Sequence, residues 1–232
     1  MSDPFATRYE ALPQILPIFP LTGAVLLPGG RLPLNIFEPR YLAMVSDALG
    51  SGRMIGMIQP LKAGGFAGDG VSEQPDEPPA VQPIGCAGRI SSFGETQDGR
   101  LLVTLSGACR FMVAEELPLH EHGYRRVQPD YSRFAADLQG GNEQVELDRS
   151  RLLGDLRRYF AANNLATDWK TLEQVDDAGL ITTICMAAPF DAAEKQALLE
   201  AETATLRGKL LIAFLEQAVL ANSNDNTSQP RH

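Results

Sequence analysis

The stretch Leu16–Tyr41, "LPIFPLTGAVLLPGGRLPLNIFEPRY", decides the fold class of this chain. Its apolar residues are interrupted by five prolines, each of which removes a backbone hydrogen-bond donor, so the stretch cannot form a membrane-spanning helix. Between the prolines lie three β-prone pieces, "ILPIF", "AVLLP" and "RLPLNIF", separated by the turn sequences "LTG" and "PGG". Because proline is confined to strand ends, edge strands and bulges, these pieces predict the short, kinked strands of a small, irregular barrel.

The β-rich character continues to about residue 130. A helix is predicted to begin at Pro39 and to end at Gly50 or Gly52. Further strands are predicted by "RMIGMIQP", "VQPIGCAGRISSFGE", "RLLVTLSGACRFMVAEE" and "YRRVQPDY", with a hairpin turn at Asp98 and Gly99. Residues 62–83 are rich in glycine, proline and acids and predict a long mobile loop. Residues 1–130 are therefore expected to form a β-barrel domain with one helix.

Beyond residue 140 the apolar residues follow helical spacing. The segment "NEQVELDRSRLLGDLRRYFAANN" predicts an amphipathic helix, and "AGLITTICMAA", capped by Asp176 or its neighbour, predicts a helix buried on nearly all sides. Asp191 and Glu194 have capping-box spacing at the start of another helix. The predicted fold class is thus α+β, with a helical bundle over residues 131–222 and a disordered polar tail over 223–232.

Charge and cysteine content narrow the classes of partner. The net charge of −9 opposes binding to nucleic-acid phosphates or to an anionic membrane surface. The first 15 residues lack the apolar core of an export signal, and three cysteines without CxxC spacing do not form a disulfide framework. These features predict a cytoplasmic protein that binds neither nucleic acid nor membrane.

Candidate catalytic residues are few. His120 and His122 could share a metal ion, but no third ligand stands at a recognisable spacing, and a solvated loop is the favoured interpretation. The cysteines lie within apolar runs, which favours buried thiols over a reactive nucleophile: Cys86, Cys109 and Cys185. We therefore expect no catalytic residue, no metal and no cofactor.

Three groups of segments resemble the N-terminal substrate-binding domain of the Lon ATP-dependent protease, a domain found also in cereblon and in stand-alone bacterial proteins. They are "LPIFPLTGAVLLPGGRLPLNIFEPRYLAMV", then "IGCAGRI" followed by "DGRLLVTLSGACRFMV", and finally "EKQALLE". The resemblance covers most of residues 14–216 and implies a PUA-like β-barrel followed by a helical bundle that engages polypeptides. The 232 residues contain no GxxxxGK[ST] phosphate loop and are too few to include the peptidase domain, so we expect neither ATP nor peptide hydrolysis by the Lon route.

The resemblance also directs attention to candidate polypeptide-binding residues, namely Phe37, Arg40, Arg89, Phe93 and Arg110. The arginines lie in the resembling motifs of a chain with 16 Arg and 4 Lys, and guanidinium groups pair bidentately with carboxylates. They could equally tie the barrel together through acids such as Glu38. The two phenylalanines flank predicted turns and could anchor a peptide, although burial in the core is the favoured interpretation for each.

The leading hypothesis is a non-catalytic module whose groove between barrel and bundle holds an unfolded or extended segment of another protein. It would serve as an adaptor or regulator in protein quality control, with a protease component as a candidate partner. One alternative is a hydrolase or transferase that uses cysteine or histidine in the cleft between the domains. Another is an RNA-binding PUA-like protein, an interpretation that rests on fold alone and that the negative charge disfavours.

Overall fold

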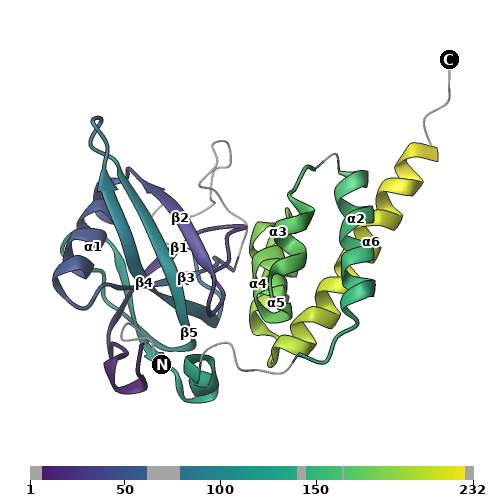
Figure 1. Cartoon of the computed structure of the whole chain (residues 1–232). Coiled ribbons are helices and arrows are strands. Elements are labelled where there is room, and N and C mark those ends of the chain that lie inside the picture. Colours follow the sequence, from purple (N-terminus) through teal and green to yellow (C-terminus); the bar gives the residue numbers. More distant parts are fainter. Residues whose placement is uncertain (1–6, 62–78, 140–144, 164, 228–232) are drawn as a thin grey trace.

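A strand-rich part lies beside a group of helices (Figure 1). The computed structural model describes residues 7–61, 79–139, 145–163 and 165–227. The mobile loop predicted over 62–83 falls largely outside these residues, although Val81, near its end, pairs with Pro60. No helix of the described residues combines the length and the apolar character needed to cross a bilayer.

The proline-rich stretch forms two short strands, β1 (Leu16–Pro20) and β2 (Arg31–Ile36). The third predicted piece, residues 24–28, is not a strand, although three of its aliphatic side chains are buried. Gly23 and Gly29 flank this piece with φ angles of 72° and 76°, which turn the chain at both ends. The prediction of short, interrupted strands is confirmed, and that of a strand over 24–28 is wrong.

The remaining strands are β3 (Met54–Ile58), β4 (Ile84–Glu95), β5 (Leu101–Leu117) and β6 (Arg125–Asp130). The order in the sheet is β2-β5-β4-β3-β1-β6, and among the described strands only β1 and β3 pair in parallel. The long β5 pairs with β4 from Leu101 to Met112 and with β6 from Met112 to Leu117. The series of pairings that leaves β5 through β4, β3, β1 and β6 therefore returns to β5. The predicted hairpin joins β4 to β5, with Gly99 at φ 76°.

Helix α1 (Pro39–Gly50) begins at the predicted proline and packs against β1 and β3. Its buried face carries Tyr41, Met44, Val45 and Ala48. It lies on the side of the sheet away from the other helices (Figure 1). The buried side chains of the strands, of α1 and of the later helices belong to one continuous apolar core.

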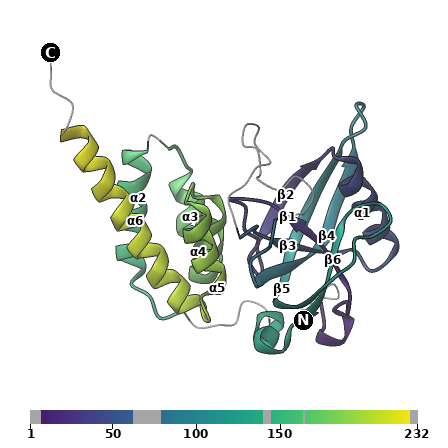
Figure 2. The ribbon, with the colours of Figure 1, turned by 180° about the vertical axis from the view of Figure 1, so that it is seen from behind.

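The helical part contains α2 (Arg149–Ala162), α3 (Trp169–Gln174), α4 (Asp177–Ala187), α5 (Ala192–Glu200) and α6 (Ala204–Thr227). Helices α2 and α6 lie side by side (Figures 1 and 2). Asp176 caps α4 by accepting a 2.7 Å hydrogen bond from the Gly179 N–H, and Asp191 and Glu194 form the predicted capping box on α5. These local signals are confirmed.

Two helical predictions need correction. Helix α4 is not buried on nearly all sides, because Thr183 and Ala187 are exposed. Helix α6 continues to Thr227, into the segment predicted as a disordered tail, since a helix whose earlier turns are packed can propagate into polar residues. Residues 228–232 lie outside the described residues.

Candidate functional site

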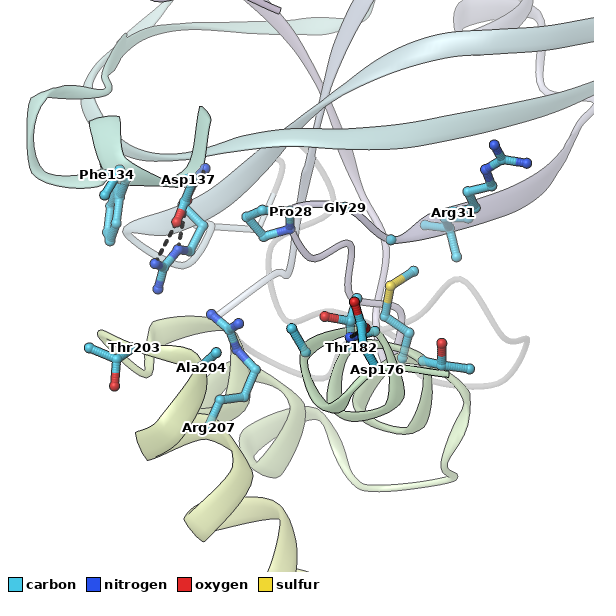
Figure 3. A pocket seen from close by; sticks show the side chains of 18 of the residues that line it. Pro28, Gly29, Arg31, Phe134, Asp137, Asp176, Thr182, Thr203, Ala204 and Arg207 are labelled. Atoms are coloured by element: carbon cyan, nitrogen blue, oxygen red, sulfur yellow. Dashed lines mark hydrogen bonds and ion pairs between the residues drawn. The ribbon is translucent and has the colours of Figure 1, made fainter. Parts of the chain in front are cut away.

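A groove of about 1050 Å³ lies between the sheet part and the helices (Figure 3). One wall is formed by residues 28–33, the loop before β2 and the start of that strand. The opposite wall is the open face of α4 together with the first residues of α6. The groove thus brings together chain segments that are about 150 residues apart in the sequence, as only tertiary packing can.

The two walls approach each other where Gly30 faces α4. A Cβ atom at Gly30 would lie 2.3 Å from Met186 Sδ and 3.2 Å from Thr182 Cγ2, so a larger residue here would require the Met186 side chain to move. The loop is also held to β5, because Gly29 N–H donates to the Gly107 carbonyl and Gly107 N–H donates to the Gly30 carbonyl, both at 2.9 Å. The sheet-side wall is therefore fixed by its backbone.

Arg110, a sequence-predicted candidate, lines the groove and is itself 4% exposed. Its Nε and Nη2 donate to the two carboxylate oxygens of Asp137 at 2.9 and 2.7 Å. Asp137 belongs to a 3₁₀ segment, η2 (Ser132–Gln139), that packs on β5. The remaining donors go to backbone carbonyls, at 3.2 Å to Leu199, 2.6 Å to Ala201 and 3.3 Å to Glu202. All five N–H donors are thus engaged, and Arg110 ties β5 to the turn between α5 and α6.

Helix α5, which carries the "EKQALLE" segment, makes the second tie between the two parts. Gln196 Nε2 donates to the Ile84 carbonyl at 3.1 Å, and Gln59 Nε2 donates to Gln196 Oε1 at 3.2 Å. Lys195 Nζ donates to the Gly23 carbonyl at 2.7 Å, and burial lowers the pKa of this lysine. These residues were missed by the sequence analysis.

Two further arginines at the groove, Arg133 and Arg207, are held by partners within the chain. Arg133 pairs with Glu202 at 3.2 Å, and Arg207 Nε donates to the Leu198 carbonyl at 2.8 Å. Figure 3 shows the Arg207 side chain reaching from α6 toward Asp137. The lining otherwise consists largely of small, hydroxyl and apolar groups, and its described residues include no cysteine or histidine. The groove therefore offers surface for binding and no nucleophile–base pair of those types.

The two phenylalanine candidates lie outside the groove. Phe37 and Phe93 are 61% and 56% exposed, so the interpretation that favoured their burial is wrong. Phe93 and Leu102 line a second depression of about 490 Å³ over β2, β4 and β5, and the Arg100 guanidinium carbon lies 5.7 Å from the centre of the Phe37 ring. These apolar side chains lie at or near strand ends.

The other two arginine candidates also lie elsewhere. Arg40 pairs with Glu38 at 2.8 Å, as the alternative interpretation suggested, but the pair is about one-third exposed rather than buried. Arg89 is half-buried on β4, opposite Met54 of β3 and Ser106 of β5. The structure thus distributes the five predicted residues over several places, and of them Arg110 is the one that lines the groove.

The cysteines do not support the enzymatic alternative. Cys86, Cys109 and Cys185 are all fully buried, as predicted. Burial raises the pKa of Cys109 and of Cys185 to about 12 and that of Cys86 well above its ordinary value. A nucleophilic cysteine needs a lowered pKa, whereas the pKa of each of these thiols is raised, which keeps them protonated.

The fold and the groove define an α+β protein in which buried polar ties hold a helical part against a sheet. The chain belongs to the family of the substrate-binding domain of ATP-dependent protease La (Lon), whose model matches residues 15–217. Lon protease 2 of Myxococcus xanthus is 26% identical over 228 residues, which is 94% of this chain and 25% of that protein. Lon protease of Anaeromyxobacter dehalogenans is 23% identical over 221 residues, again 94% of this chain and 25% of the relative.

Solved structures show the same fold. The Lon N-terminal domain protein of Xanthomonas campestris has a TM-score of 0.57 at 24% identity, over 86% of this chain and 98% of its own. The N-terminal domain of the Mycobacterium avium complex Lon protease has a TM-score of 0.56 at 15% identity, over 87% and 98%. The chain spans about a quarter of the length of these curated relatives.

Proposed function

We propose that this chain is a non-catalytic module that binds an unfolded or extended polypeptide segment in the groove between its sheet and its helices. The observation that carries the proposal is the groove itself, with its mixture of apolar, hydroxyl and backbone groups. Its volume of about 1050 Å³ matches the upper end of ligand pockets, about 1,000 Å³, and is enough for several side chains of an extended segment.

Strand β2 supports an extended ligand. Among the described strands it pairs with β5 alone, so its other edge is open for backbone hydrogen bonds. Arg31, Leu32 and Pro33 of this strand line the groove. A polypeptide bound along such an edge gains affinity from its main chain, with little demand on its sequence. Pro33 lacks an N–H, which interrupts the edge and limits how far a foreign strand can extend along it.

The proposed module consists of a PUA-like barrel and a helical bundle. The return of the strand pairing through β5 supports the barrel assignment. We propose to place the boundary between the two domains after Gln139 rather than at residue 130. The reason is that η2 packs on β5, with Phe134 buried and Asp137 bound to Arg110.

The test is fluorescence anisotropy with a labelled polypeptide that is reduced and alkylated so that it stays unfolded. Ala187 is exposed and lines the groove, so Ala187→Trp should obstruct it and weaken binding at least ten-fold. Ala161→Trp, at an exposed position of α2 outside the groove, is the matched control and should bind like the parent protein. Equal affinity in the two variants, or preference for the folded form of the polypeptide, contradicts the proposal.

The exposed phenylalanines are proposed as secondary contacts for a long polypeptide. Phe93→Ser should weaken binding of a long unfolded chain and leave binding of a short groove-length peptide unchanged. If Phe93→Ser abolishes binding and Ala187→Trp does not, the depression over β2, β4 and β5 is the binding site instead of the groove.

We also propose an adaptor or regulatory role with a protease component, a proposal that rests on the relatives being Lon proteases. A module that holds an unfolded segment without cleaving it can either deliver that segment to a protease or withhold it. Degradation of an unfolded substrate by a Lon protease, measured with and without this chain, distinguishes the two cases by the sign of the change in rate. No change in rate argues against any such role.

A further inference from the structure

A cluster of metal-ligating side chains lies between α1 and the turn that connects β5 to β6. Asp47 comes from α1, and His120 and His122 come from the turn. Each offers one ligand atom, and these atoms all lie within 4.8 Å of one another. The third ligand that the sequence spacing could not supply is therefore contributed by a helix about 75 residues away. Since α1 is on the far side of the sheet from α2–α6, the cluster is separate from the groove (Figures 1 and 2).

The turn holds the two imidazoles close together. His120 N–H donates to the Tyr124 carbonyl at 2.9 Å, and Gly123 N–H donates to the His120 carbonyl at 2.7 Å. Gly123 has a φ of 80°, which favours glycine at this position. The ring centres of His120 and His122 are 5.0 Å apart as a result. The backbone therefore sets the spacing of the two histidines.

Tyr124 orients the other members of the cluster. It is 5% exposed, its hydroxyl donates to Asp47 Oδ2 at 2.9 Å, and its ring stacks on His120 with a centroid distance of 4.3 Å and an interplanar angle of 16°. His122 Nδ1 lies 3.3 Å from the same Asp47 oxygen. A buried group that fixes the ligands from behind is what metal sites require beyond the ligands themselves.

We propose that Asp47, His120 and His122 bind a divalent transition-metal ion of the Zn²⁺ class. Two imidazoles and a carboxylate match the ligand preference of Zn²⁺ and of its neighbours Ni²⁺ and Cu²⁺, whereas Mg²⁺ and Ca²⁺ prefer oxygen ligands. The side chains of Asp47 and His122 are 41% and 49% exposed, so an ion reaches the site without any opening of the fold. Three protein ligands leave at least one position of a tetrahedral ion to water or to a group on a partner. Bound metal would also link α1 to the β5–β6 turn.

Isothermal titration calorimetry of the full chain with ZnCl₂ tests the proposal. We expect saturable binding of one ion per chain, and Asp47→Asn and His122→Ala should each weaken it at least ten-fold. Asparagine keeps an acceptor for Tyr124, so Asp47→Asn removes the charge without removing the contact. His232→Ala, which changes the histidine outside the cluster, is the control and should bind Zn²⁺ like the parent protein.

A second variant separates a built site from casual binding by surface histidines. Tyr124→Phe keeps the ring that stacks on His120 and removes the hydroxyl that holds Asp47, and it should weaken Zn²⁺ binding about 10-fold or more. Zn²⁺ should also raise the melting temperature of the parent protein and not that of Asp47→Asn, because only the folded chain brings the ligands together. Equal affinity for parent, Asp47→Asn and His122→Ala, or no saturable binding at millimolar Zn²⁺, overturns the proposal.

Discussion

Removal of the Arg110 side chain should destabilise this protein more than removal of any exposed arginine. The Arg110 and Asp137 side chains are 5% and 9% exposed, and Arg110→Ala leaves the carboxylate buried with one remaining hydrogen bond, from the Arg110 N–H. It also removes the donor for three backbone carbonyls. Breaking a buried ion pair by deleting one partner costs about 3 to 5 kcal/mol, because the other charge is left uncompensated. For a chain of this size the melting temperature should fall by on the order of 10 °C.

Urea titration, followed by far-UV circular dichroism and by the fluorescence of the single tryptophan, Trp169 of α3, measures this loss. Arg100→Ala is the matched control, since Arg100 also forms an ion pair, at 2.8 Å to Asp98, but both side chains are about half exposed and solvent screens them. The double variant Arg110→Met/Asp137→Leu should recover part of the loss, because no charge is then left buried. An Arg110→Ala midpoint equal to that of Arg100→Ala would refute the reasoning.

Three further predictions concern packing and the buried thiols. Gly107→Ala should destabilise the fold by about 1 to 3 kcal/mol, because the added Cβ would lie 2.0 Å from the Leu27 carbonyl oxygen. Gly50→Ala, whose Cβ would meet no atom within 4 Å, is the control, and the urea midpoints of the two variants are compared. Iodoacetamide should leave the buried cysteines unmodified in the folded chain at pH 8, and mass spectrometry showing rapid labelling contradicts this. Folding raises the pKa of Cys109 and of Cys185 from 9.0 to about 12. The two protonated thiols therefore contribute fully to stability below pH 9, and this contribution is lost as the pH rises toward 12. Urea midpoints measured across that pH range test this.

Local signals in the sequence predicted much of the fold. The helix beginning at Pro39, the caps at Asp176 and Asp191 and the hairpin at Gly99 each depend on residues within a few positions of one another. Such interactions depend little on distant parts of the chain, so a linear pattern identifies them. The errors have the opposite character. Residues 24–28 have strand-like side chains, but tertiary contacts decide their backbone conformation.

The candidate site could be predicted only in outline. A groove between the two parts was expected, yet four of the five candidate residues lie outside it. Arg110 was chosen as a possible contact for polypeptides, but its partners Leu199 and Ala201 are about 90 residues away, and no spacing rule reveals them. Asp47 was not connected with the histidine turn for the same reason. Patterns identify residue types, and the fold decides which of them meet.

The ties between the two parts have a consequence for how the groove can change. Arg110 and Lys195 bind mainly to backbone carbonyls of the opposite part, and Gln196 does so through Ile84. Every residue has a backbone carbonyl, whatever its side chain. These contacts therefore require an arginine, a lysine and a glutamine at the donor positions but place little restriction on the residue type at the acceptor positions. The groove walls, by contrast, consist largely of small and hydroxyl side chains that make few of these ties. Substitutions there can therefore alter the shape of the groove while the joint between sheet and helices keeps its geometry.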